Sequence, residues 1–430
     1  MCVLPTKQNQ KVASMKYLSK AVLFFFLVIN FQFSGLNLKA QSYNCYLYGS
    51  ITTVDGDIYE GPIRWNDEEV FLTDIFNSEK IENPYLKYLD KEVRDDKYVE
   101  KRKSKYGFEV SRRNYRDVQY SKYIKKFECR FGDIASISVT GEKSVNLELK
   151  TGKFINLSGG SNDLGNKVWV LDNELGLLKI DWNRIDIVNF FRPNTKPSEN
   201  FGEPIYGKIT STIGEFEGFI QWDHDERLLQ DKLDGWSKDG DVNIPFNKIS
   251  KIQKIERGSR ITLPSGRQLD LKSSNDVTRN NRGIIVTIPE VGRIDFTWDH
   301  FLSLQLMPVP QDVVSCFSEF KDSERLYGKI STNNGKTYEG VIVYDLDEAM
   351  DSEILNGLND KLDFSIPFRN IKKIEPKSYN YCLVELKNGE NLYLGDQTDV
   401  SGKNLGILIF TGPEEYQFLK WEDIKVLEIL

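Results

Sequence analysis

Three stretches of this sequence repeat one pattern: YGSITTVDGDIYEGPIRWNDEE at residues 48–69, YGKITSTIGEFEGFIQWDHDE at 206–226 and YGKISTNNGKTYEGVIVYDLDE at 327–348. Self-similarity of this kind is typical of proteins built from repeated structural units. The pattern predicts three repeats, at residues 42–194, 195–312 and 313–430. It indicates an architecture but no chemistry.

The strand predictions come from alternation. Apolar residues or glycines alternate with mostly polar ones through residues 59–65, 216–222 and 338–344, as in half-buried antiparallel strands. The central glycine of each run (Gly61, Gly218, Gly340) predicts a sharp bend that lets one strand serve two sheets. Asp55-Gly56 and Asn334-Gly335 are hairpin signals. Helical periodicity is absent from the repeats, so the predicted fold class is all-β.

Each repeat has two halves. The first half ends on F-x-x-I-x-x-I at residues 131–137, 246–252 and 368–374. The second half contains a recurrent aspartate (Asp163, Asp276, Asp399) and closes near a recurrent tryptophan (Trp182, Trp298, Trp421). In the first repeat, residues 163–168 are fewer than their counterparts 276–284, so that loop is expected to differ. The chain thus predicts six small units.

The pattern [YF]-E-G-x-I-x-[WY], followed by F-x-x-I-x-x-I, resembles the SH3-like or Sm-like small β-barrel. Apart from residues 80–127, the chain beyond the N-terminal segment also resembles secreted bacterial repeat proteins of uncharacterised function. These share the Y-G-x-I opening and an N-D-V…N-R-G-I second half, seen at residues 275–277 and 281–284. The resemblance implies tandem small barrels, two per repeat, and no activity. A six-bladed β-propeller is the alternative, because six four-stranded units could also close a ring.

The N-terminus reads as a signal peptide. Lys16 and Lys20 precede an apolar run at residues 21–31 that is too short to span a bilayer, and Ala40 or Gln41 offers a cleavage point. An uncleaved anchor is the alternative. We therefore expect a secreted, periplasmic or outer-envelope protein with no integral membrane segment after cleavage.

Charge and cysteine content limit the partners. The formal net charge is -7, and removing the five lysines of residues 1–41 makes it more negative. A nucleic-acid partner is disfavoured, because binding phosphates requires a basic face. Two disulfides, Cys45–Cys129 and Cys316–Cys382, would each stay inside one repeat, and free buried thiols are the alternative.

Residues 80–127 form an insertion in the first repeat, rich in lysine, arginine and tyrosine. Part of it, residues 85–105, could be a solvated helix. One interpretation is a partner-binding arm that meets an envelope protein or an anionic polysaccharide. The other is a solvated loop that caps the first barrel. The partner-binding candidates are Arg102, Lys103, Arg112, Arg113, Tyr115 and Arg116.

The recurrent residues have structural explanations beside functional ones. Trp65, Trp222 and Tyr344 could stack on sugars, but their strand face predicts core, as it does for Trp182, Trp298 and Trp421. Trp169 and Trp236 do not recur and could be exposed. Glu60, Glu217 and Glu339 point outward, where a lysine or arginine pair is the simpler expectation. Three acidic pairs could bind calcium, although turn chemistry explains them more simply: Asp67-Glu68, Asp225-Glu226 and Asp347-Glu348. Asp163, Asp276 and Asp399 are expected to fix loops by accepting backbone hydrogen bonds.

Enzyme chemistry has little support in the sequence. His224 and His300 are the two histidines, neither recurs, and no nucleophile, phosphate-loop or metal motif is present. We expect no catalytic residues, cofactor or metal. The leading hypothesis is a non-catalytic secreted or envelope scaffold. A glycan- or cation-binding module is the alternative, and a carboxylate-dependent hydrolase is a third reading.

Overall fold

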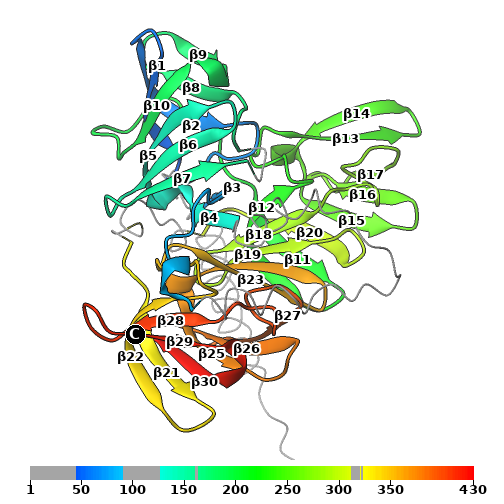
Figure 1. The fold of residues 1–430 in the computed structure, drawn as a ribbon. Coiled ribbons are helices and arrows are strands. Elements are labelled where there is room, and N and C mark those ends of the chain that lie inside the picture. The colour runs from blue at the N-terminus through cyan, green and yellow to red at the C-terminus, as the bar shows by residue number, and fades with distance from the viewer. Residues whose placement is uncertain (1–44, 91–125, 160–162, 311–319, 321–322) are drawn as a thin grey trace, which may run out of the picture. The chain divides into compact units, whose positions relative to one another are not determined.

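The computed structural model describes residues 45–90, 126–159, 163–310, 320 and 323–430. Residues 43–430 form one compact unit. The predicted signal segment and all six partner-binding candidates of the insertion lie outside the described residues. The described chain consists of strands and short 3-10 turns, so the all-β prediction is confirmed (Figure 1).

The strands fall into three groups along the chain. The first comprises β1 (Tyr48–Thr53), β2 (Ile58–Trp65), β3 (Ile75–Glu79), β4 (Lys126–Arg130), β5 (Ile134–Gly141), β6 (Ser144–Leu149), β7 (Phe154–Ser158), β8 (Val168–Asp172), β9 (Gly176–Ile180) and β10 (Ile185–Phe190). The second comprises β11 (Tyr206–Ser211), β12 (Glu215–Trp222), β13 (Lys232–Ser237), β14 (Gly240–Pro245), β15 (Lys251–Ile255), β16 (Gly258–Thr262), β17 (Gln268–Leu271), β18 (Ile284–Ile288), β19 (Gly292–Phe296) and β20 (Phe301–Leu306). The third comprises β21 (Tyr327–Thr332), β22 (Thr337–Val343), β23 (Ile354–Asn359), β24 (Leu362–Pro367), β25 (Ile371–Pro376), β26 (Tyr381–Leu386), β27 (Asn391–Gly395), β28 (Ile407–Phe410), β29 (Tyr416–Leu419) and β30 (Ile424–Ile429).

One strand order recurs in all three groups. The first repeat runs β7-β6-β5-β10-β1-β2-β8-β9, and the pairings of the second and third repeats reproduce this order with equivalent strands. The remaining two strands of each repeat form a hairpin: β3–β4, β13–β14 and β23–β24. The sequence repeat is therefore also a repeat of sheet topology.

The bent strand serves two partners, as predicted. Through residues 58–62, β2 pairs with β1, and through residues 63–65 it pairs with β8. Gly61 lies at the crossover, where an added Cβ would stand 1.8 Å from the carbonyl oxygen of Leu171. The same applies at Gly340, where a Cβ would meet the carbonyl oxygen of Phe410 at 2.1 Å. Glycine is required there because the backbone of another strand passes too close for any side chain.

The two halves of a repeat are not separate barrels. Strand β2 of the first half pairs with β8 of the second, and β10 pairs with both β1 and β5. The halves therefore share one sheet, and among the described strands no sheet closes on itself. The alternative of six separate four-stranded blades does not match this order either. Periodicity shows which residues form strands, but pairing between distant strands depends on tertiary packing.

Short 3-10 turns place the aromatic residues of the core. The F-x-x-I and W-x-x-I patterns form η4 (Phe131–Asp133), η5 (Trp182–Arg184), η6 (Phe246–Lys248), η7 (Phe368–Asn370) and η8 (Trp421–Asp423). Each turn buries its first aromatic ring and leads into a strand. In the first repeat, the rings of Phe131 and Trp182 lie 5.6 and 6.0 Å from Trp65. Such tilted and edge-on contacts favour a defined core.

Repeats 2 and 3 share a continuous sheet. Strand β19 of repeat 2 pairs with β24 of repeat 3 through Arg293↔Ser365, Ile294↔Phe364 and Asp295↔Asp363. Ile294 and Phe364 are buried in one hydrophobic cluster that spans both repeats. Strand pairing and apolar burial thus join these two repeats.

Repeats 1 and 2 pack through a different surface. Tyr46 and Phe71 of repeat 1 belong to a buried cluster with Tyr206, Phe219 and Leu228 of repeat 2. The buried Arg227 guanidinium forms an ion pair with Asp74 and lies 5.3 Å from the centre of the Phe71 ring. Arginine suits such a site because its flat guanidinium can stack and donate at the same time.

Repeats 1 and 3 meet at the start of the insertion. Lys80 is buried, and its Nζ lies 2.5 Å from Glu353 Oε1 and 2.9 Å from the Asp347 carbonyl oxygen. Residues 86–88 form the 3-10 turn η1 (Leu86–Tyr88), and the Tyr88 ring lies 5.0 Å from Phe410. The first residues of the insertion therefore cover repeat 3, whereas the sequence suggested a solvated helix or a cap on repeat 1.

The favoured disulfide pairing is wrong. Cys129 and Cys382 are buried free thiols, which excludes both Cys45–Cys129 and Cys316–Cys382. Burial raises the pKa of the Cys382 thiol to about 12, so this group is a core residue with little thiolate character.

Candidate functional site

The structure changes which acidic residues of the three repeats correspond to one another. Isolated bridges join Trp65 to Glu69, Trp222 to Glu226 and Tyr344 to Glu348. The counterparts of Asp225-Glu226 are therefore Glu68-Glu69, one residue later than the predicted Asp67-Glu68. Asn66, which stands where the other repeats have Asp223 and Asp345, obscured this correspondence in the sequence.

The recurrent aspartate of each second half (Asp163, Asp276 or Asp399) accepts a backbone N–H group from the hairpin of its own repeat. This is the side-chain to backbone hydrogen bond that the sequence predicted. The Asp276 carboxylate accepts the backbone N–H of Asp234 at 2.7 Å, and Asp399 accepts that of Asn356 at 2.7 Å. Asp163 accepts from Asn77 at 2.5 Å. The carbonyl oxygens of the same three residues accept from Trp65 Nε1, Trp222 Nε1 and the Tyr344 hydroxyl. The three buried aromatics are thus core residues with satisfied polar atoms, not a sugar-stacking platform.

In repeats 1 and 2, the recurrent aspartate lies close enough to the recurrent glutamate to raise its pKa. Burial raises the pKa of Glu226 to about 9, with a further contribution from Asp276. Burial also raises the pKa of Asp276 to about 6. In repeat 1, burial raises the pKa of Asp163 to about 7, and burial together with Asp163 raises that of Glu69 well above its usual range. Buried neighbouring carboxyls favour the protonated form.

The acids of repeat 2 gather most closely. Carboxylate oxygens of Asp223, Glu226 and Asp276 lie within 4.8 Å of one another, which is the kind of ligand set that a hard cation prefers. Arg282 already forms an ion pair with Asp223 at 3.0 Å, and the Asn275 amide donates to the same carboxylate. The positive charge at this cluster is thus supplied by the protein.

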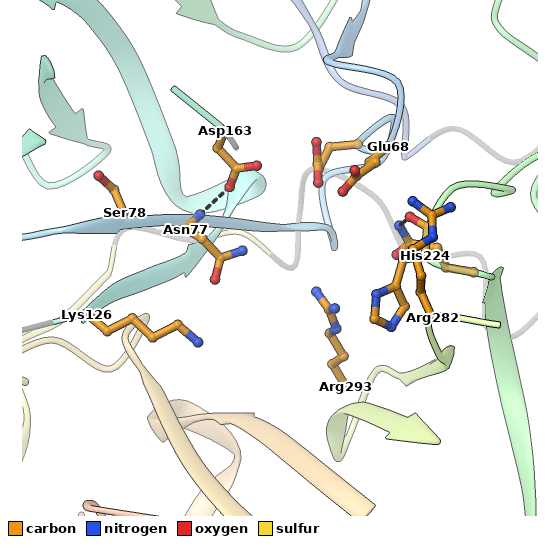
Figure 2. A pocket seen from close by; sticks show the side chains of 10 residues that line it. Glu68, Asn77, Ser78, Lys126, Asp163, His224, Arg282 and Arg293 are labelled. Atoms are coloured by element: carbon orange, nitrogen blue, oxygen red, sulfur yellow. Dashed lines mark hydrogen bonds between the residues drawn. The ribbon is translucent and has the colours of Figure 1, made fainter. Parts of the chain in front are cut away.

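A polar cavity of about 360 Å³ lies between repeats 1 and 2. Its acidic wall comes from Glu68, Glu69 and Asp163 of repeat 1. Its other lining residues are Asn77, Ser78, Lys126, Gln221, His224, Arg282 and Arg293. Arg293, on β19, extends toward Glu68 from the opposite side, and Lys126 lies near Asn77 (Figure 2). We call this space cavity 1.

Some of the ionisable side chains around cavity 1 already contact acidic residues of the protein. The His224 Nε2 lies 2.9 Å from Asp295 Oδ2, and Arg282 pairs with Asp223 and Asp225. Arg293 forms no ion pair within the described residues. Glu69 is buried, and its Oε2 has no hydrogen-bond partner there. Cavity 1 therefore presents the Arg293 guanidinium to a bound polar ligand.

A second cavity, of about 290 Å³, lies between repeats 1 and 3. Glu348, Glu353 and Asp399 of repeat 3 line it together with Lys126 and Glu128 of repeat 1. Each cavity thus contains recurrent acids of one repeat only, and Lys126 borders both. The three repeats do not form three equivalent sites, because their surroundings differ.

The outward glutamates have an unexpected partner. The Tyr48 hydroxyl donates to Glu60 at 2.9 Å, and Tyr206 donates to Glu217 at 3.0 Å. Tyr327 and Glu339 repeat the contact at 3.4 Å. The predicted cross-strand basic partner is present for two of the three, since Lys208 lies opposite Glu217 and Lys329 opposite Glu339, whereas Glu60 lies opposite Ser50. Both the tyrosine and the glutamate recur in the opening pattern, so a search for co-recurring donors and acceptors could have found the pair.

The remaining candidates are placed as follows. Trp182, Trp298 and Trp421 are buried, whereas Trp236 is 53% exposed and Trp169 is half-buried. His300 bonds the Thr212 hydroxyl at the surface. Arg293 was not predicted from the sequence, and Lys126 was predicted only as a basic residue of the insertion, because their positions in cavity 1 depend on contacts between repeats.

The comparisons with known proteins identify no relative. No family model matches the sequence, and no curated protein matches it. One solved structure, described as a streptogramin B lyase, has 11% identity and a TM-score of 0.10, with 70% of this chain and 94% of that chain covered. A TM-score of this size supports no conclusion about fold or activity. Within the described residues, no helix is long and apolar enough to cross a membrane.

Proposed function

We propose that this protein is a non-catalytic interaction scaffold of the envelope or the secreted fraction. One observation carries the proposal: the recurrent aspartates hold the fold of each repeat, while cations that do not recur join the repeats to one another, in part through a recurrent acid such as Asp347. Asp276 and Asp399 hold backbone N–H groups. Arg227 and Lys80 have no equivalent in the other repeats, and they pair with Asp74 and Glu353 across interfaces. A scaffold requires such fixed geometry.

Two finer parts of the proposal come from the sequence. The Gly-bent strand that pairs on both sides supports a relationship to SH3-like small barrels. The N-terminal segment supports export, with cleavage after Ala40 or Gln41. Terminal sequencing of the exported protein tests the latter, and an intact N-terminus on the exported chain would contradict it.

The insertion is the proposed contact with an envelope protein. We expect that the whole protein retrieves one specific partner from envelope extracts. Replacing Arg102, Lys103, Arg112, Arg113 and Arg116 by glutamine should abolish this capture. A matched control replaces five exposed cations elsewhere by glutamine: Lys238, Arg257, Arg267, Lys387 and Lys420. Equal loss in both variants, or no loss in either, would contradict a specific role of the insertion.

A second candidate function is the binding of an anionic glycan in cavity 1. The elevated pKa values of Glu69 and Asp163 reduce the negative charge of one wall near neutral pH. Arg293 then faces hydrogen-bonding groups such as Asn77 and Ser78, whereas Lys126 at the cavity edge pairs with Glu128 at 2.7 Å. A sugar unit that carries a carboxylate fits both features, because a guanidinium can bind the carboxylate with two parallel hydrogen bonds.

Calorimetric titration tests the glycan hypothesis. We expect oligogalacturonate to bind and raise the melting temperature, and a neutral galactose oligomer to do neither. Arg293→Gln should abolish binding, whereas Arg267→Gln, at an exposed turn of the same repeat, should not. Binding that survives Arg293→Gln would place the ligand outside cavity 1.

A further inference from the structure

We infer that a second copy of this chain pairs its strand β14 with strand β9, extending the eight-stranded sheet of repeat 1. The inference starts from the junction of repeats 2 and 3. There, β24 of one repeat pairs with β19 of the other. Each repeat contains an equivalent of both strands, so the same junction can form elsewhere.

The equivalence is defined by register. Strand β9 pairs with β8 from Val168↔Ile180 to Asp172↔Gly176, just as β19 pairs with β18 from Ile284↔Phe296 to Ile288↔Gly292. Strand β14 pairs with β13 from Lys232↔Pro245 to Ser237↔Gly240, just as β24 pairs with β23 from Ile354↔Pro367 to Asn359↔Leu362. Strand β9 therefore corresponds to β19, and β14 to β24.

Both strands have an open edge. Within the described residues, β9 pairs only with β8 and ends its sheet, and β14 pairs only with β13 (Figure 1). The two do not pair within one chain, where repeats 1 and 2 instead pack through Phe71, Arg227 and their neighbours. An open strand edge exposes unpaired N–H and C=O groups and is a template for another strand.

The side chains fit the inferred pairing. The β19–β24 register, transferred to β9 and β14, places Leu177 opposite Asn243, Leu178 opposite Val242 and Lys179 opposite Asp241. Leu178 and Val242 are half-buried and already pack against their own cores. They occupy the positions of Ile294 and Phe364, which the established junction buries almost completely. Next to them, Leu175 and Leu177 are 65% and 56% exposed.

The charges favour a second copy. The established junction sets Asp295 opposite Asp363, a like-charge pair. The inferred junction sets Lys179 opposite Asp241, and opposite charges across a strand pair are favourable. Each copy supplies one β9 and one β14, so a closed pair of copies would contain two such junctions related by a two-fold axis.

Charge reversal tests the pairing. By light scattering across a concentration series, we expect the purified protein to associate. Lys179→Asp and Asp241→Lys should each weaken association roughly ten-fold or more, because each sets like charges opposite one another. Mixing the two single variants should restore association, because opposite charges then meet at both junctions. The double variant should also associate.

The control is Lys420→Asp, at an exposed turn of repeat 3, which should leave association unchanged. Three results overturn the inference: a monomer at every concentration, association that neither single variant weakens, or single variants that do not recover on mixing. If another protein occupies the β9 edge while copies of this chain stay apart, the inference is equally overturned.

Discussion

At the scale of single residues, the recurrent acids are placed where burial opposes their charge. Glu226 is the clearest case, because its Oε2 is buried without a hydrogen-bond partner among the described residues and Asp276 lies nearby. Its pKa of about 9 compares with an ordinary value of 4.5. Between these values the folded chain keeps a proton that the unfolded chain releases, so stability falls as pH rises through that window.

Glu226→Gln removes this dependence. We expect the variant to be more stable than the parent by about 4–5 kcal/mol at pH 8 and nearly equal to it below pH 4. Urea unfolding at both pH values, in buffer with a chelator, measures the difference. Glu256→Gln, in the exposed turn between β15 and β16, is the matched control and should show no such dependence. A loss of stability at pH 8 would show that the Glu226 carboxylate is ionised and favourably paired.

At this scale, residue patterns correctly predicted several structural roles. The alternation correctly predicted Trp65 and its equivalents as core, and the recurrence of Asp276 correctly predicted a loop-fixing role. The acidic pair of repeat 1 was placed one residue early because Asn66 interrupts the acidic run. The Tyr48–Glu60 contact was missed because strand charges were expected to meet lysine or arginine.

At the scale of elements, the bent strand (β2, β12 or β22) joins the two halves of each repeat. A glycine at its midpoint allows the backbone of another strand to cross, and no side chain fits there. The bend could be predicted from the sequence. Its partner could not, because the pairing of β2 with β8 joins residues about a hundred positions apart, and short-range periodicity carries no information on such pairings.

Gly340→Ala tests the crossing. The added methyl group would stand 2.1 Å from the Phe410 carbonyl oxygen, so β22 and β28 must separate. We expect a loss of about 3 kcal/mol or more, since overpacking against backbone cannot be relieved by a side-chain rotation. Gly412→Ala is the control, because its new methyl group would meet Glu415 at an ordinary contact distance of 3.6 Å. Comparable unfolding free energies for the two variants would show that β28 can move at little cost.

At the scale of the whole molecule, three unlike interfaces join three like repeats. A shared sheet joins repeats 2 and 3, an apolar cluster with Arg227 joins repeats 1 and 2, and Lys80 with η1 joins repeats 1 and 3. Recurrence predicts the repeats, but their interfaces also depend on residues that do not recur, such as Arg227 and Lys80. For the same reason, cavity 1 and its Arg293 could not be predicted from the repeated pattern.

Lys80 forms one of the buried ionic contacts between repeats 1 and 3, beside that of Arg369 with Asp133. Burial opposes its charge, yet Asp347 and Glu353 raise its pKa, and Lys80 in turn helps to hold the pKa of the buried Glu353 below its usual range. Glu353 also accepts the backbone N–H groups of Ala349 and Met350. Removing the lysine would therefore leave a buried carboxylate without its counter-charge.

Lys80→Met should cost about 3–5 kcal/mol near neutral pH, as expected when one partner of a buried ion pair is lost. The parent's contribution from Glu353 is present above its ordinary pKa of 4.5 and is lost as pH falls through the lower folded value. The cost of Lys80→Met should therefore shrink below pH 4. Adding Glu353→Gln to Lys80→Met should recover part of the lost stability at pH 7, because glutamine stays neutral and can still accept a backbone hydrogen bond. Denaturant unfolding of the two variants and the parent measures both effects. Lys387→Met, at an exposed turn, is the control, and a Lys80→Met cost no larger than that of the control would mean that this ion pair does not hold repeats 1 and 3 together.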